Sequence, residues 1–141
     1  NRHSYWGNLG IYTKWIPGGE AESSGALTKA VELAEKALEV SPNDYNVRAN
    51  LAEYCARLGD NRRAMKEIDR IPETARSAHA AQLVIAYELT GRRNEAIQLI
   101  VSGLKTDASL NVIKNDPDLR ALWADAKLQR SLAARTAATP P

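Results

Sequence analysis

The side chains that most often carry chemistry in proteins are scarce in this sequence. The 141 residues include two histidines, His3 and His79, and one cysteine, Cys55. The histidines are too few and too far apart in sequence to form a zinc-binding helix motif, so we expect them to be solvated or to cap helices. A single cysteine excludes an intrachain disulfide framework and a Cys-based zinc site. Its apolar surroundings predict a buried and inert thiol.

Two further patterns that suggest chemistry have simpler explanations. Pro17-Gly18-Gly19 lacks the Gly-Lys-Ser/Thr that a phosphate-binding loop requires, and it is expected to be a turn. Three carboxylates recur at helical spacing and are expected to be solubilising charge on a solvated face: Glu32, Glu35 and Glu39. With no nucleophile motif, cofactor fingerprint or metal-ligand spacing, the sequence favours a non-enzyme that holds no cofactor and no metal.

Composition narrows the class of protein. Hydrophobic residues make up 44% and charged residues 26% of the chain, and the formal net charge is +2. Acids and bases alternate along the chain, so no basic stripe indicates nucleic-acid binding. No apolar run reaches the length of a membrane span. The lone cysteine and the lack of glycosylation acceptor sequences favour a cytoplasmic protein. Because the chain starts at Asn1 without Met, we expect a fragment of a larger multidomain chain.

Two stretches of the chain share one layout and predict the elements of the fold. Residues 51–64 and 83–96 each contain an apolar helical run that ends at a glycine, Gly59 or Gly91. Each glycine suits the left-handed position that follows a helix, and a second helix starts within a few residues, with a small Ala at its first buried point. The chain is therefore expected to form repeated helical hairpins.

These hairpins resemble the tetratricopeptide repeat, whose unit has Trp, Leu-Gly and Tyr on its first helix and Ala, a large apolar residue, Ala and Pro on its second. The matching residues of the three units are Trp6, Leu9, Gly10, Ala30, Ala37, Leu38 and Pro42; Leu51, Ala52, Gly59, Ala64 and Ile68; and Leu83, Tyr87, Gly91, Ala96, Ile100 and Leu104. The resemblance implies an all-α, right-handed superhelical solenoid in residues 1–135, with repeats at about 3–42, 44–75 and 76–108.

The sequence departs from the regular repeat in three places. The first unit has about eight surplus residues, which we assign to an enlarged loop at 16–22, and Pro72 arrives early and should shorten the second helix of the second unit. Asp116 and Pro117 then predict a new helix start, followed by an apolar face formed by Leu119, Leu122 and Trp123. We expect a capping helix at 116–135 that covers the last hairpin, and a disordered tail at 136–141. This ending resembles the C-terminal repeat regions of large bacterial signalling proteins.

The resemblance also implies a concave groove, lined by the first helices of the hairpins, that binds a peptide or a neighbouring domain. Carried over to this sequence, the groove residues are Ile11, Lys14, Trp15, Asn46, Ala49, Asn50, Glu53, Arg57, Ala78, Gln82, Ile85, Glu88 and Leu89. Ala49, Ala78 and Ile85 have an alternative role in packing between hairpins. Glu53 and Arg57 are expected to project into the groove and to contribute little to stability. The donor set with which some members capture the C-terminus of heat-shock chaperones is absent apart from Asn50, so that role is rejected.

Two classes of function remain open from the sequence. The first is a protein-interaction module that uses the groove. The second is a structural spacer or a self-association domain, in which an uncovered end pairs with another copy. An alternative binding surface is the basic edge of the turns, which consists of Arg62, Arg63, Arg92 and Arg93.

Overall fold

The chain folds into helices joined by short turns. The computed structural model describes residues 2–104 and 107–138, and no strand occurs within those ranges. The helices are α1 (Arg2–Thr13), α2 (Glu20–Val40), α3 (Tyr45–Arg57), α4 (Asn61–Asp69), α5 (Glu73–Arg76), η1 (Ser77–His79), α6 (Ala80–Leu89), α7 (Arg93–Gly103), α8 (Asp107–Lys114), η2 (Pro117–Leu119), α9 (Arg120–Trp123) and α10 (Ala126–Ala137). The predicted all-α class is confirmed.

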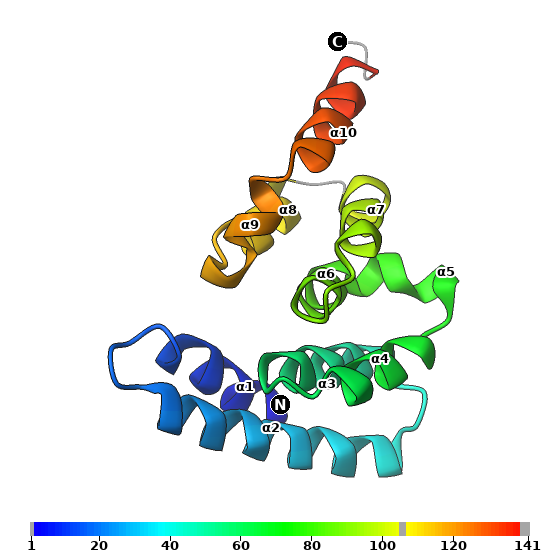
Figure 1. The fold of residues 1–141 in the computed structure, drawn as a ribbon. Helices are drawn as coiled ribbons and strands as arrows, with labels where there is room; N and C mark the ends of the chain where they lie inside the picture. Colours follow the sequence, from blue (N-terminus) through cyan, green and yellow to red (C-terminus); the bar gives the residue numbers. More distant parts are fainter. Residues whose placement is uncertain (1, 105–106, 139–141) are drawn as a thin grey trace.

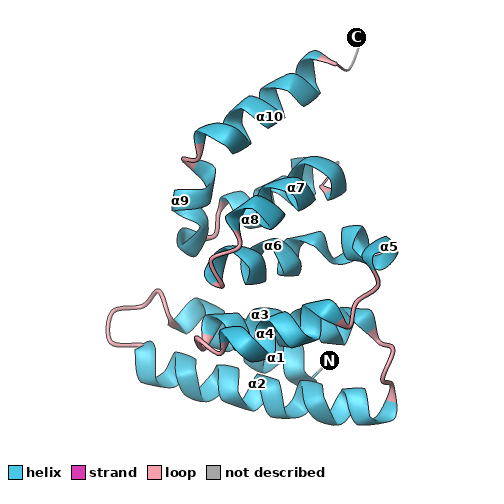
Figure 2. Cartoon of the chain, turned by 45° about the vertical axis from the view of Figure 1, so that its right-hand side comes forward, coloured by secondary structure: helices cyan, strands magenta, loops and turns pink. Residues whose placement is uncertain are grey.

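Successive helices stack as hairpins. α1 packs on α2 and α3 on α4, while α6 packs on α7 and also on α3 of the preceding hairpin. Figure 1 shows α1 to α4 in one layer, with α6 and α7 beside them and α8 and α9 beyond. In this view and in the turned view of Figure 2, α10 lies at one end of the molecule, where it contacts α7 and α9. A stack of helical hairpins is the expected solenoid.

Small residues let the paired helices approach closely. Ala30, Ala34, Ala52, Ala64 and Ala96 are fully buried at the contacts between helices. Larger apolar side chains fill the space between hairpins, and the fully buried ones include Leu51, Ile68, Leu83 and Ile100. One continuous core therefore runs from α2 to Leu128 at the start of α10.

The two repeated glycines end their helices as the sequence predicts. Gly59 and Gly91 both have φ of 80°, a backbone conformation that side chains with a Cβ rarely adopt. The next residue donates its N–H back into the helix, from Asp60 to Cys55 O at 2.9 Å and from Arg92 to Tyr87 O at 2.8 Å. This is the expected left-handed helix ending.

Three local features of the hairpins differ from the regular repeat. The enlarged loop spans 14–19, because residues 20–22 already belong to α2, where Glu20 and Glu22 suit the positive end of the helix dipole. The shortened helix before Pro72 is confirmed, since α4 ends at Asp69. The first helix of the third unit is broken into α5, η1 and α6. Arg76 ties this break to the preceding unit by donating from Nε to Ile71 O at 3.1 Å.

The C-terminal segment starts as predicted and then departs from a single helix. The Asp116 carboxylate accepts the N–H of Asp118 at 2.9 Å, and Pro117 occupies the first helical position. Leu119 and Leu122 are fully buried. The segment then breaks because the Asp125 carboxylate caps a separate helix, α10, and accepts the N–H of Lys127 at 2.8 Å.

The ends of the expected cap and tail also differ from the structure. Trp123 is half-buried and donates from Nε1 to Ile113 O at 3.2 Å. α8, which no sequence signal indicated, precedes the cap and packs on α6. α10 runs to Ala137, so residues 136 and 137 of the expected tail are helical, while 139–141 lie outside the described residues.

Candidate functional site

A pocket of about 260 Å³ lies where α1, α3 and α6 face α8 and the start of η2. We call it the central pocket. Its lining includes these residues of the predicted groove: Ile11, Trp15, Asn50, Glu53, Arg57, Gln82 and Ile85. The remaining lining residues are Asn8, Tyr12, Tyr54, Ala81, Val112, Asn115 and Asp116. Side chains that recur at helical spacing on the first helix of each hairpin thus line one common cavity.

The central pocket combines apolar surface with amide groups. Tyr12 on α1 is 65% exposed and Val112 on α8 is 62% exposed, so two large apolar side chains flank it. The amides of Asn50 and Gln82 lie on the neighbouring helices α3 and α6. The indole Nε1 of Trp15 is buried and has no hydrogen-bond partner among the residues that the structure describes. Such a pocket suits a peptide segment that offers an apolar side chain and backbone groups for hydrogen bonds.

The other predicted groove residues lie outside this pocket. Lys14 forms an ion pair with Asp118 at 2.7 Å, and the exposed Asn46 only accepts a bond from Asn50 through its backbone oxygen. Ala49 is fully buried in the core, which is the packing role left open for it. The last three do not line the pocket either: Ala78 is exposed on η1, Leu89 packs against the core, and Glu88 pairs with Arg93 at the turn.

Glu53 and Arg57 both line the central pocket, but they are buried in ion pairs, which corrects the expectation that they contribute little to the fold. Their side chains are 7% and 1% exposed. Arg57 donates from Nε to Glu53 at 2.9 Å, from Nη2 to Asp116 at 2.5 Å and from Nη1 to Asp118 at 3.0 Å. Burial raises the pKa of the Glu53 carboxyl, against the opposing effect of Arg57. The pKa of Arg57 is raised by the surrounding carboxylates, which outweigh its burial.

Asp116 and Asp118 are functional candidates that the sequence reasoning treated only as parts of a helix start. Their carboxylates reach Arg57 on α3, and Asp118 also reaches Lys14 near the end of α1. Lys14 and Arg57, two cations of the predicted groove, therefore both pair with aspartates of one short segment that lies far from them in the sequence. The Asp-Pro-Asp pattern carries a local capping signal, and nothing in its spacing indicates this distant pairing.

The basic turn edge is mostly engaged in ion pairs. Arg63 pairs with Glu35, Arg93 pairs with Glu88, and Arg92 lies 3.7 Å from Glu95. Within the described part of the chain, Arg62 has no ion-pair partner.

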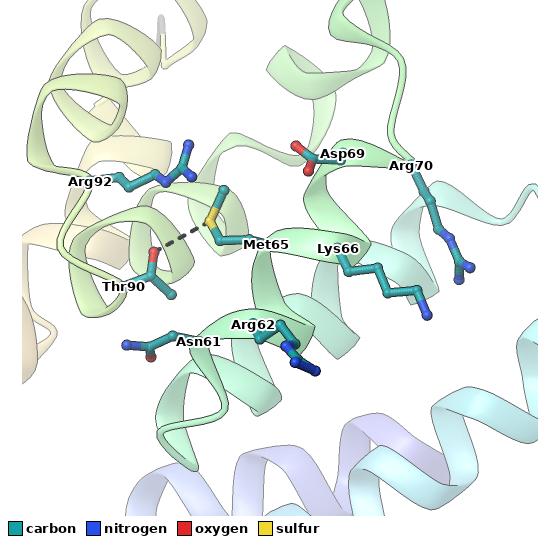
Figure 3. A pocket seen from close by; sticks show the side chains of 8 residues that line it. All are labelled: Asn61, Arg62, Met65, Lys66, Asp69, Arg70, Thr90 and Arg92. Carbon is teal, nitrogen blue, oxygen red and sulfur yellow. Dashed lines mark hydrogen bonds between the residues drawn. The ribbon is translucent and has the colours of Figure 1, made fainter.

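A shallow pocket nearby is lined by Asn61, Arg62, Met65, Lys66, Asp69, Arg70, Thr90 and Arg92. Figure 3 shows that Lys66 and Arg70 point away from Arg92 instead of converging with it. A bound phosphate or carboxylate needs hydrogen-bond donors that converge on it, and the cations of the shallow pocket do not converge. The central pocket is therefore the stronger candidate for a binding site.

The two histidines differ in their surroundings. His3 is 1% exposed, which corrects the expectation of a solvated or capping side chain, and its Nδ1 lies 3.4 Å from the hydroxyl of Tyr54. Burial lowers the pKa of this imidazole. His79 is half-buried at the residue before α6 and makes no side-chain capping bond there. Among residues 2–104 and 107–138, no cluster of three His, Cys, Asp or Glu side chains is placed to hold a metal ion.

Cys55 should resist modification while the chain is folded. The thiol is 1% exposed, and burial raises its pKa to about 12, so almost no thiolate is present at neutral pH. We expect iodoacetamide labelling to follow global unfolding in a urea series monitored by mass spectrometry. Rapid labelling in native buffer would contradict the predicted burial.

Comparison with known proteins supports one family. Residues 21–85, from the start of α2 into α6, match the model of the tetratricopeptide repeat. Searches of curated proteins and of solved structures gave no match. Within the described residues, no helix is both long enough and apolar enough to cross a membrane.

Proposed function

The chain contains tetratricopeptide repeats, which generally serve as protein-interaction modules, and from this premise we propose that the central pocket binds a peptide segment of a partner protein. The pocket lining supports this proposal. Residues from three first helices, α1, α3 and α6, line one cavity that combines exposed apolar surface with side-chain amides. The partner is a segment of protein or a neighbouring domain of the same parent chain. No nucleic acid takes part in this proposal.

The recognition that we propose has two components. An apolar side chain of the partner packs between Tyr12 and Val112, which are largely exposed in the unbound chain. Its backbone bonds to the amides of Asn50 and Gln82. The proposed role is binding and involves no catalysis.

One observation favours self-association as the second candidate. In α10, Leu128 is the only buried residue among those described, and the helix lies at one end of the molecule, in contact with α7 and α9 (Figure 1). A second copy that packs against this helix would cover its half-buried Leu132. Light scattering over a concentration series tests this alternative, because dimerisation follows mass action.

Two valine variants test the pocket. Peptides that bind the whole chain would first be selected from a displayed random library, and their affinities would then be measured for Val112→Ser and Val40→Ser. Both valines are exposed, but Val112 lines the pocket and Val40 ends α2 on another part of the surface. Val112→Ser should weaken binding about tenfold, because a tenfold change corresponds to about 1.4 kcal/mol and burying a valine contributes about 1.5–3 kcal/mol.

Val40→Ser serves as the matched control and should leave the affinity unchanged. Both variants should retain the helical content and the melting temperature of the parent chain. Equal affinity of the selected peptides for both variants would show that they bind elsewhere. In that case the basic turn edge becomes the surface to test, through Arg62→Ala.

A further inference from the structure

Part of the groove is already occupied by the chain itself. The end of the connection from α8 places Asp116 against Arg57, and η2 places Asp118 against both Arg57 and Lys14. Asp116, whose side chain is 6% exposed, lines the central pocket together with Arg57. These contacts connect the C-terminal segment to α3 and to the residue that directly follows α1, and both helices carry predicted groove residues.

The Arg57 guanidinium is arranged for two carboxylates besides the one on its own helix. Its Nε faces Glu53, while Nη1 and Nη2 each face a different aspartate. If the segment moved away, Arg57 would keep Glu53 but lose the partners of both Nη atoms, and Lys14 would lose Asp118. Charge-assisted bonds from a planar fork are geometrically specific, so this arrangement selects two carboxylates in a defined relative position.

We infer that Asp116 and Asp118 act as a resident ligand of the groove, and that the partner is an acidic protein segment with two carboxylates two residues apart, which exchanges with them. This inference rests on the function proposed above, because it names the chemistry of the groove's partner. When a groove is closed in most molecules, the apparent affinity for its partner equals the intrinsic affinity multiplied by the fraction of molecules in which the groove is open. Weakening the resident contacts should therefore strengthen binding of an acidic segment supplied from outside.

A synthetic peptide with the sequence of residues 112–122 is the probe for this exchange. Its affinity would be measured by fluorescence anisotropy for the full chain and for the double variant Asp116→Asn with Asp118→Asn. Asparagine is as good a helix N-cap as aspartate, so the local helix start is kept while both charges are removed. The double variant should bind the peptide at least about tenfold more tightly than the unchanged chain, and added salt should weaken that binding.

Two controls make the result specific to the groove. Asp125→Asn removes a carboxylate from another helix N-cap, one that pairs with Arg93 at 3.6 Å, and it should not change peptide affinity. A peptide that carries Asn in place of both aspartates should not bind the double variant. If the double variant does not fold, Asp118→Asn alone is the test, because Asp118 is 19% exposed and Asp116 keeps its bond to Arg57.

Equal binding of the 112–122 peptide to the unchanged chain and to the variant, or binding to neither, would overturn the exchange. If the library-selected peptides still depend on Val112 in that case, the pocket is a binding site with a different ligand chemistry. If they do not depend on Val112, the proposed function itself is wrong. The peptide-exchange experiment and the valine-variant experiment can therefore fail independently of each other.

Discussion

Replacing Arg57 with Met should lower the free energy of unfolding by about 3–5 kcal/mol, the range for breaking a buried ion pair by removing one partner. The change leaves two carboxylates, Glu53 and Asp116, buried without their main partner, since their side chains are only 7% and 6% exposed. Methionine fills a similar volume without charge, so the loss reflects electrostatics more than a cavity. Urea unfolding followed by circular dichroism measures it.

Arg93→Met is the matched control for this loss. Arg93 also pairs with two carboxylates, Glu88 and Asp125, but its side chain is 40% exposed. Exposed ion pairs contribute about 0–1 kcal/mol because water screens them. If Arg57→Met costs no more than Arg93→Met, the contacts between the C-terminal segment and α3 do not form in solution.

The loss in Arg57→Met should also depend on pH. Burial raises the pKa of Glu53 in the folded chain above its ordinary value of 4.5, and removing Arg57 takes away the effect that opposes burial. A carboxyl whose folded pKa is raised favours folding below its unfolded pKa and loses that contribution as pH rises through the folded pKa. The difference from the unchanged chain should therefore be smaller near pH 4.5 than at pH 7. Adding Glu53→Gln should remove much of this pH dependence.

Replacing Gly10 with Ala should destabilise the fold by about 1–3 kcal/mol, as overpacking does in well-packed cores. Gly10 lies where α1 crosses α2, and its carbonyl accepts the hydroxyl of Ser23 at 2.6 Å. A Cβ at this position would lie 2.6 Å from Leu27 Cγ and 3.0 Å from both Leu27 N and Ser23 O. The backbone atoms of α2 can give way only if the two helices separate.

Gly25→Ala supplies a control of opposite sign. Gly25 is also helical, but it is exposed on α2, and a Cβ there would meet no atom within 4 Å. Alanine in a helix is favoured over glycine by roughly 0.5–1 kcal/mol, so this variant should be more stable than the unchanged chain. Thermal unfolding of both variants measures the contrast. Equal effects would mean that α1 and α2 are not in close contact at Gly10.

Features that depend on neighbouring residues could be predicted from the sequence. Gly59 and Gly91 end helices because the left-handed conformation excludes most side chains, and Pro72 limits α4 because proline cannot continue a helix. Asp116 caps η2 through its own neighbours. The repeated apolar spacing predicted which helix faces are buried, because apolar residues at helical spacing share one face and that face packs against the neighbouring helices. The all-α fold and the repeat family follow from these local rules.

The central pocket was predictable only in part. Residues such as Ile11, Asn50 and Ile85 share helix faces, and these faces do meet in one cavity. Ala49 lies on the same face in the sequence pattern but is buried in the core. Periodicity gives the direction of a side chain around its helix, whereas burial depends on the distance to the next hairpin, which the pattern does not contain.

The ion pairs between the C-terminal segment and two of the predicted groove residues were decided by tertiary structure alone. The sequence determined the helical hairpins, their turns and the cap at Asp116, because each depends on residues within a few positions. It did not determine that the broken C-terminal segment returns to α3 and the end of α1, where Asp116 and Asp118 pair with Arg57 and with Lys14 just after α1. Charged side chains are ordinarily exposed, so an isolated Glu53 and Arg57 predict a solvated pair. They are buried because stacking of the hairpins brings distant carboxylates into reach of one guanidinium.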